Sequence, residues 1–304
     1  MFAKYMKKGL AVGMACVIMA AGVWGSTVPV HAEEDVTVDE TVDGGALVFT
    51  QYDFTMDEYA MEQFKRVGSY TQEEYRTVLA AANDNTDGFQ YLRLDRFHEI
   101  DTKGYITLCR SFIKKYCEAA NLDYTASSLY KKEKYLVKAA QKYELDPVYF
   151  ACQTFLEAAY GTSTLGRGVT IKRVAYEDFR TKSGGKLKTK KLKKAVKVYN
   201  LYGIRAIDAD PLVGGTSYAY YQGWTTVKKA IYGAASFVSD GYIHSEKYDQ
   251  NTLFKIRYNP SRTNIWHQYA TDAYYARKIG LKMKDFSELY TNRGQFVYDY
   301  PDWN

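Results

Sequence analysis

The chain has 304 residues, with 41 Lys and Arg against 35 Asp and Glu, and four scattered cysteines. This length can bury a sizeable core in one or two domains, and so few cysteines exclude a small disulfide-stapled scaffold. Because no Cys/His group has metal-ligand spacing, we expect neither a metal nor a cofactor. The 30 tyrosines stand out; a ring with a polar tip suits a wet cleft that holds sugars, or an ordinary amphipathic surface.

Residues 1–32 are typical of a signal peptide. Three lysines precede an apolar run over residues 9–24, and a small-residue cleavage site ends at Ala32. We therefore expect a secreted protein. The alternative is an uncleaved segment that anchors the protein in the membrane, since the apolar run is near the short limit for a span.

Two regions follow the predicted signal peptide. Residues 33–48 are acidic and poor in apolar residues, which favours a disordered spacer. Residues 49–125 have helical patterns, including possible caps at Thr55 and Thr71 and a helix from Thr102 to Ala120. No catalytic motif falls in this helical extension, so we expect it to pack against the next domain, act as a spacer or bind a protein partner.

The stretch from Asp146 to Leu165 predicts a helix that carries one carboxylate at its far end. Asp146 is a plausible N-cap, Pro147 fits the first helical position, and a small-residue turn begins at Gly161. Glu157 lies in the last turn, where the macrodipole disfavours a negative charge. Desolvation would raise its pKa further, as a general acid requires. The alternative is an ordinary surface glutamate.

The elements around this helix predict a helical domain with a small β-lobe. Residues 128–145 are amphipathic and should form a helical hairpin with the Glu157 helix. Residues 166–197 are rich in Gly, Lys and β-branched residues, which favours strands over 169–176 and 195–199. Further helices are expected over 227–238, capped by Thr225 or Thr226, and over 269–283. Residues 291–304 form a tail without a predicted structure.

Five blocks, in this order, carry a family resemblance: FLEAAYGTSTL, YNLYGIRA, GTSYAYYQGWTTVKKAIYGAASFV, QNTLFKIRYNP and HQYATD. Together they resemble the bacterial endo-β-N-acetylglucosaminidases of glycoside hydrolase family 73. The resemblance implies a mainly α, lysozyme-like (α+β) domain over 126–290, acting on peptidoglycan glycan strands at the cell wall. It implies hydrolysis of the β-1,4 bond between N-acetylglucosamine and N-acetylmuramic acid, with Glu157 as the catalytic acid.

The second catalytic group stays open between two alternatives. A carboxylate of the lobe could face Glu157, with Glu177 the first choice; the others are Asp178, Asp208, Asp210 and Asp272. Alternatively the N-acetyl group of the substrate attacks, and the hydroxyl of Tyr269, which matches a family position, orients it. We favour this substrate-assisted route.

Several side chains are candidates for holding the sugar chain, by stacking or by hydrogen bonding. Each of them could equally belong to the core or to the wall of the cleft; they are Tyr199, Tyr202, Tyr220, Trp224 and Gln268.

Nine basic and no acidic residues lie between Arg180 and Lys197. For an exported protein the fitting polyanion is an anionic wall polymer or membrane surface, contacted through Lys182–Lys197, and nucleic acid is not expected. A solvated loop is the alternative. Two rival functions remain: a lytic transglycosylase of the same fold, and a non-catalytic wall-binding or assembly protein.

Overall fold

The computed structural model describes residues 45–80 and 85–304. The expected signal peptide and all but the last residues of the expected spacer lie outside these ranges. Within them, no helix combines the length and apolar character that a membrane crossing requires.

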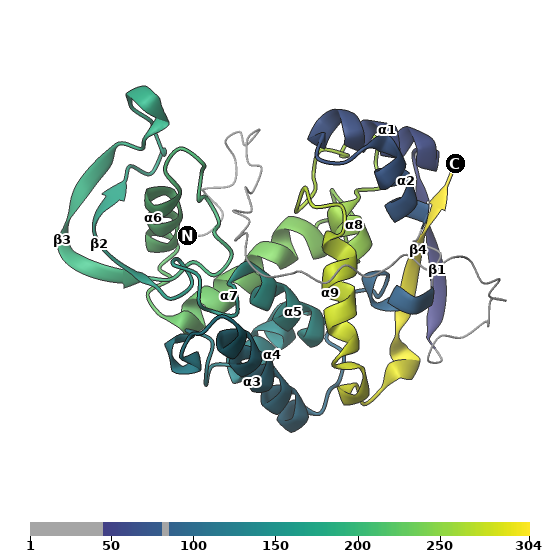
Figure 1. The fold of residues 1–304 in the computed structure, drawn as a ribbon, viewed down its shortest axis with the longest axis horizontal. Coiled ribbons are helices and arrows are strands. Elements are labelled where there is room, and N and C mark those ends of the chain that lie inside the picture. The colour runs from purple at the N-terminus through teal and green to yellow at the C-terminus, as the bar shows by residue number, and fades with distance from the viewer. Residues whose placement is uncertain (1–44, 81–84) are drawn as a thin grey trace.

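The described residues form a mainly helical body with a two-stranded sheet at each end (Figure 1). The sheet of β2 and β3 lies at one end with α6, and the sheet of β1 and β4 lies at the other. Central helices fill the space between them: α3 (Thr102–Ala119), α4 (Lys134–Lys142), α5 (Pro147–Glu157), α7 (Val227–Val238) and α9 (Tyr275–Lys284). The architecture is the one expected from the sequence.

Helix α5 forms as predicted. The side chain of Asp146 accepts a hydrogen bond from the backbone N–H of Tyr149, and every residue from Pro147 to Phe155 is buried. The helix ends at Glu157 because three consecutive residues then take positive φ angles. The last of them is Gly161, where a Cβ atom would lie 2.7 Å from the hydroxyl oxygen of Ser127. Only glycine fits this turn.

Helix α4 is shorter than predicted, because it begins at Lys134. The preceding residues bind the turn that follows Glu157: Ser127 donates its hydroxyl hydrogen to the carbonyl of Tyr160, and the N–H of Ser128 reaches the carbonyl of Gly161. The segment expected to extend the helix therefore fixes the backbone beyond the carboxylate. Helix α4 itself packs against α5 and α7, as the predicted helical hairpin requires.

The lobe is an antiparallel hairpin of β2 (Val169–Ala175) and β3 (Thr189–Val198), packed on α6 (Pro211–Tyr221). The return strand begins six residues before the predicted start at Ala195. The pairing continues past a register shift as far as Ala175 opposite Thr189. Lysines fill this part of β3, and lysine is depleted in strands, so composition concealed it.

Strands β1 (Ala46–Tyr52) and β4 (Val297–Trp303) form a parallel pair, with Ala46 opposite Val297 and Tyr52 opposite Trp303. One expectation was wrong here: the end of the predicted spacer and the start of the predicted helical extension form a strand. The C-terminal tail, for which no structure was predicted, forms a strand as well. Helices α1 (Met56–Val67) and α2 (Gln72–Ala80) then follow. The expected cap at Thr55 and the expected capping box at Thr71 are present, and Thr55 forms a capping box as well.

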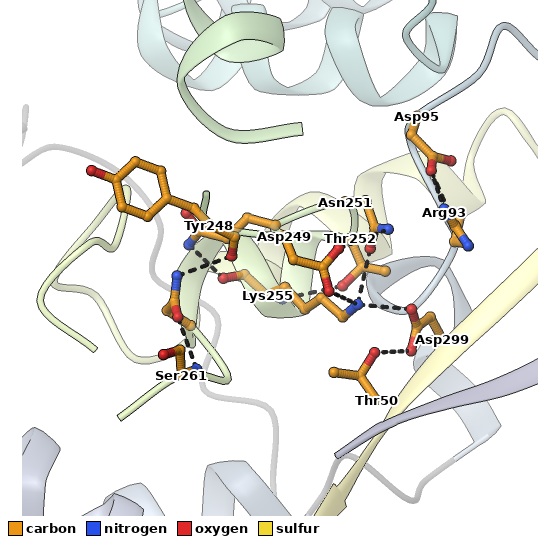
Figure 2. Close-up of polar contacts among 12 residues, drawn as sticks. Thr50, Arg93, Asp95, Tyr248, Asp249, Asn251, Thr252, Lys255, Ser261 and Asp299 are labelled. Atoms are coloured by element: carbon orange, nitrogen blue, oxygen red, sulfur yellow. Dashed lines mark hydrogen bonds and ion pairs between the residues drawn. The ribbon is translucent and has the colours of Figure 1, made fainter. Parts of the chain in front are cut away.

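A buried lysine joins this sheet to the short helix α8 (Leu253–Arg257), as Figure 2 shows. The ammonium group of Lys255 lies 2.8 Å from Oδ2 of Asp299 on β4 and 3.1 Å from Oδ1 of Asn251. Thr50 on β1 donates its hydroxyl hydrogen to the other carboxylate oxygen of Asp299 at 2.7 Å. Both chain ends are thereby fastened to the element that leads into the Tyr269 loop.

Candidate active site

Glu157 is the last residue of α5, and its carboxyl is half-buried. The hydroxyl of Tyr275 donates a hydrogen bond to Oε1 of Glu157 at 3.2 Å. Burial raises the pKa of Glu157 to about 7, although hydrogen bonds from Tyr275 and Tyr269 act to lower it. Desolvation therefore outweighs both donors. The carboxyl can hold a proton near neutral pH and still exists partly as the carboxylate.

Tyr269 reaches this carboxyl from a loop, whereas the sequence predicted that it begins a helix. Helix α9 begins only at Tyr275. Asp272, between these two tyrosines, makes other hydrogen bonds. Its carbonyl oxygen accepts from Nε of Arg257 at 2.8 Å, and its side-chain Oδ1 accepts from the N–H of Tyr274 at 3.0 Å. The rings of Tyr269 and Tyr275 stack, with centroids 5.3 Å apart, so the two hydroxyls are presented to Glu157 as a pair.

Sequence reasoning missed two residues of this site: Tyr275 itself, and Gln153, which orients the Tyr275 hydroxyl. The side-chain amide of Gln153, wholly buried, donates from Nε2 to the hydroxyl oxygen of Tyr275 at 3.0 Å. An oxygen that accepts this bond keeps its own hydrogen for Glu157, so the amide fixes the direction of the Tyr275 bond. A signal was present: Tyr149, Gln153 and Glu157 recur every four residues and share one face of α5.

Further tyrosines surround the carboxyl electrostatically. Tyr202, 6% exposed, donates its hydroxyl hydrogen to Oγ1 of Thr154 at 3.0 Å, because the Thr154 hydrogen is used on the carbonyl of Phe150. Burial, followed by the neighbouring Tyr202 and then Glu157, raises the pKa of Tyr149 well above its ordinary value. For Tyr202, burial and then the charge of Glu157 raise the pKa well above its ordinary value. The phenols stay protonated and can only act as neutral hydrogen-bonding groups.

The candidate second carboxylates lie elsewhere. Glu177 follows β2, its side chain is 67% exposed, and its nearest cation is the ammonium of Lys190 at 4.0 Å. Asp272 pairs with Lys278 at 2.6 Å, and Asp210 accepts from the N–H of Leu187 at 3.1 Å. Burial and two tyrosines account for the pKa of Glu157, with no contribution from another described carboxylate.

The expected sugar-binding residues separate into two groups. Tyr202 lies within the electrostatic reach of Glu157, as does the catalytic candidate Tyr269. The other four lie in different surroundings. Tyr199 lines a surface hollow with Lys132 and residues 225–228, and Tyr220 packs against Tyr221. Trp224 is only 6% exposed and packs against Tyr218, and Gln268 accepts a hydrogen bond from Arg257. Trp224 also covers Gly233, where any Cβ would strike its indole, so it is largely a core residue.

No group of three or more metal-ligating side chains comes together among the residues described. Cys109, Cys117 and Cys152 are buried and free, as predicted. Glu157 lies beside the phenolic hydroxyls of Tyr269 and Tyr275. A carboxyl that can hold a proton near neutral pH at the end of a helix has the property that a general acid requires.

The comparison with known families agrees. The model described as "Glucosaminidase: Mannosyl-glycoprotein endo-beta-N-acetylglucosaminidase" matches residues 133–288, about half of the chain, and the chain belongs to this family of glycoside hydrolases. A bifunctional autolysin of Staphylococcus epidermidis is 32% identical over 215 residues, or 71% of this chain. A beta-N-acetylglucosaminidase of Bacillus subtilis is 37% identical over 160 residues, or 53% of this chain. The chain spans only 14% and 15% of these two relatives.

Solved structures confirm the fold. Glucosaminidase B of S. aureus matches with a TM-score of 0.55 and 25% identity, covering 86% of this chain and 94% of that one. Autolysin E of S. aureus, solved in complex with the muropeptide NAM-L-ALA-D-iGLU, matches with a TM-score of 0.56 at 22% identity, covering 83% and 98%. The expected lysozyme-like, mainly helical fold is thus correct.

Proposed function

We propose that the protein is an exported peptidoglycan hydrolase that cleaves the β-1,4 bond between N-acetylglucosamine and N-acetylmuramic acid. One observation carries the assignment: burial places the pKa of Glu157 at about 7, beside the hydroxyls of Tyr269 and Tyr275. Family membership supports the reaction class, and the muropeptide bound to the similar autolysin E supports the substrate class.

In the first step the protonated Glu157 gives its proton to the glycosidic oxygen as the bond to C1 breaks. The oxocarbenium-like transition state needs a nucleophile. In our proposal the carbonyl oxygen of the substrate's N-acetyl group attacks C1, and Tyr269 orients that group. Water then adds to C1 as the bond between C1 and the acetamido oxygen breaks, which restores the N-acetyl group, and Glu157, now a carboxylate, takes a proton from the water. This route is supported by the reach of Tyr269 to the Glu157 carboxyl, whereas Glu177 is 67% exposed and pairs with Lys190.

Export is part of the proposal and depends on residues 1–32, whose composition is typical of a signal peptide. Mass determination of the mature protein tests it. A mature N-terminus at Glu33 supports secretion to the wall, and a retained Met1 supports a membrane anchor.

The activity is tested by mass spectrometry of the sugars released from purified peptidoglycan, with Glu157→Gln as the matched variant. Reducing-end N-acetylglucosamine, absent with the variant, is the expected result. Reducing-end N-acetylmuramic acid would instead indicate a muramidase, and anhydro-muramyl ends a lytic transglycosylase. If neither protein releases sugar, the site is a non-catalytic scaffold.

A further inference from the structure

The β2–β3 hairpin holds an unusual concentration of positive charge. Residues 169–198 contain eleven basic and two acidic side chains, a formal charge of +9, whereas the whole chain is only +6. The remaining residues together therefore carry –3. The hairpin is a separate electrostatic region rather than part of a uniformly basic protein.

Few of these cations have a partner. Glu177 lies 4.0 Å from Lys190, and Asp178 lies 3.8 Å from Arg180. The guanidinium of Arg173 donates hydrogen bonds to Thr189. In the part of the chain that the structure describes, seven exposed lysines of the hairpin have no ion pair or ring contact: Lys172, Lys182, Lys186, Lys188, Lys191, Lys193 and Lys194. Like charges gathered on one hairpin repel one another, and physiological salt screens this repulsion only beyond about 8 Å.

The fold presents these lysines on a firm support. Ile171, Val174 and Val198 are buried, and the hairpin packs on α6, which lies inside its curve (Figure 1). Ser217 of α6 accepts a hydrogen bond from the N–H of Ala175 at 2.8 Å. From Lys188 to Lys197 the strand extends up to about 30 Å at about 3.3 Å per residue. The result is an elongated strand with exposed positive charge on both of its faces.

We propose that this hairpin binds a linear phosphodiester polymer of the cell wall, in which charged phosphates link polyol units. The seven unpartnered cations are all lysines, which bind phosphate as point charges, whereas recognition of a single headgroup favours the bidentate fork of arginine. A row of point charges suits a chain with a repeated anion and no fixed register. Binding there would concentrate the enzyme on the wall and relieve the repulsion within the hairpin.

The surface chemistry disfavours a bilayer as the partner. Proteins that lie on membranes place Trp, Phe or Leu beside their basic residues, to enter the acyl boundary. The exposed large apolar residues of the described chain lie outside residues 169–198, for example Phe49, Phe64 and Trp266. A hairpin without an apolar anchor fits a soluble polyanion instead.

The test measures binding to purified cell walls by co-sedimentation, in the Glu157→Gln background so that the walls are not digested. The variant Lys191→Gln/Lys193→Gln/Lys194→Gln is compared with Lys115→Gln/Lys138→Gln/Lys284→Gln, which removes the same charge from exposed lysines outside the hairpin. We expect the hairpin variant to bind at least tenfold more weakly and the control less than twofold. The plot of log affinity against log salt concentration should be less steep for the hairpin variant, with a slope smaller in magnitude by about two.

The ligand is identified by two further arms. Walls stripped of phosphodiester polymer by acid should bind both proteins equally weakly, and vesicles of anionic phospholipid should not distinguish them. Equal losses by both triple variants, hairpin-dependent binding to stripped walls, or hairpin-dependent binding to vesicles would each overturn the proposal. Turnover of soluble glycan fragments by the hairpin variant with Glu157 intact should stay unchanged, so the assay is independent of the proposed catalytic function.

Discussion

The amide nitrogen of Gln153 lies 3.0 Å from the hydroxyl oxygen of Tyr275, one helical turn before the carboxyl that the same hydroxyl bonds. Gln153 therefore belongs to the site although its side chain is wholly buried and bonds Tyr275 instead of Glu157. With its nitrogen facing Tyr275, the amide leaves the phenol a single use for its hydrogen. The consequence is a hydrogen bond that stabilises the charged form of Glu157 and opposes the effect of burial.

Removing this bond should shift the pH dependence of the reaction. A general acid works when protonated, so kcat/KM falls as pH rises through the pKa of Glu157, about 7. In Tyr275→Phe the carboxylate loses a donor, so its pKa rises and the falling limb should move upward by about one pH unit. Gln153→Leu should move it in the same direction by less. The measurement is the pH profile of kcat/KM.

Tyr202→Phe is the matched control for that profile. Its hydroxyl donates to Thr154 and makes no hydrogen bond to Glu157, so the limb should stay in place whatever the effect on the maximal rate. A limb that moves equally in all three variants would mean that loss of any nearby hydroxyl acts through solvent access, and not through the Gln153–Tyr275 pair.

Glu157 should also cost the protein stability above neutral pH. Its ordinary pKa of 4.5 is raised to about 7 on folding, so the folded state holds the proton more tightly than the unfolded chain. The stability linked to this proton is fully present below 4.5 and is lost as pH rises through 7. Glu157→Gln, which cannot ionise, should therefore raise the Tm relative to wild type at pH 8 and change it little at pH 4. A Tm difference that does not vary with pH would contradict the raised pKa.

Two variants distinguish the candidates for the second catalytic group. Under substrate assistance Glu177→Gln keeps kcat within about threefold of wild type, since an exposed carboxylate tied to Lys190 has no part in the reaction. Tyr269→Phe should lower kcat at least tenfold, because the N-acetyl group loses its hydrogen-bond donor. A tenfold loss means that the activation free energy rises by about 1.4 kcal/mol. Steady-state kinetics on one defined glycan would decide. The reverse ranking would establish a lobe carboxylate as the partner of Glu157.

The buried pair of Lys255 and Asp299 predicts a stability effect far from the chemistry. Their side chains are 2% and 5% exposed, so Lys255→Met leaves Asp299 charged and buried and should destabilise the protein by about 3–5 kcal/mol. Adding Asp299→Leu should recover most of that loss. Urea unfolding measures both. The exposed pair of Lys65 and Glu62 is the control, and Lys65→Met should cost no more than about 1 kcal/mol.

The local part of the site could be predicted from the sequence. The cap at Asp146, the proline after it and the turn at Gly161 act within a few residues, so helix α5 and the place of Glu157 in it follow from short-range rules. The family resemblance added the role of the carboxyl. The face shared by Gln153 and Glu157 was also readable, but an isolated buried glutamine gives no indication of which distant hydroxyl it meets.

The parts that sequence reasoning missed depend on long-range pairing. Tyr275 lies 118 residues from Glu157, and the loop that brings it there is held by Arg257 through the carbonyl of Asp272, a bond with no sequence pattern. The first half of β3 was hidden because lysine predicts neither a strand nor its register. Strand β4 was missed because a parallel partner 251 residues away leaves no trace in the tail itself.

The pairing of β1 with β4 has a consequence for the order of folding. Strand β1 finds its partner only after residues 297–303 have been made. Closing so long a loop is slow relative to forming α5 or the β2–β3 hairpin, whose contacts are local. Helix α5 and the lobe can therefore assemble first, and the arrival of β4 locks the extension last. A nascent chain, or one clipped before β4, would keep β1 as an unpaired edge, open to proteolysis and to pairing with another copy.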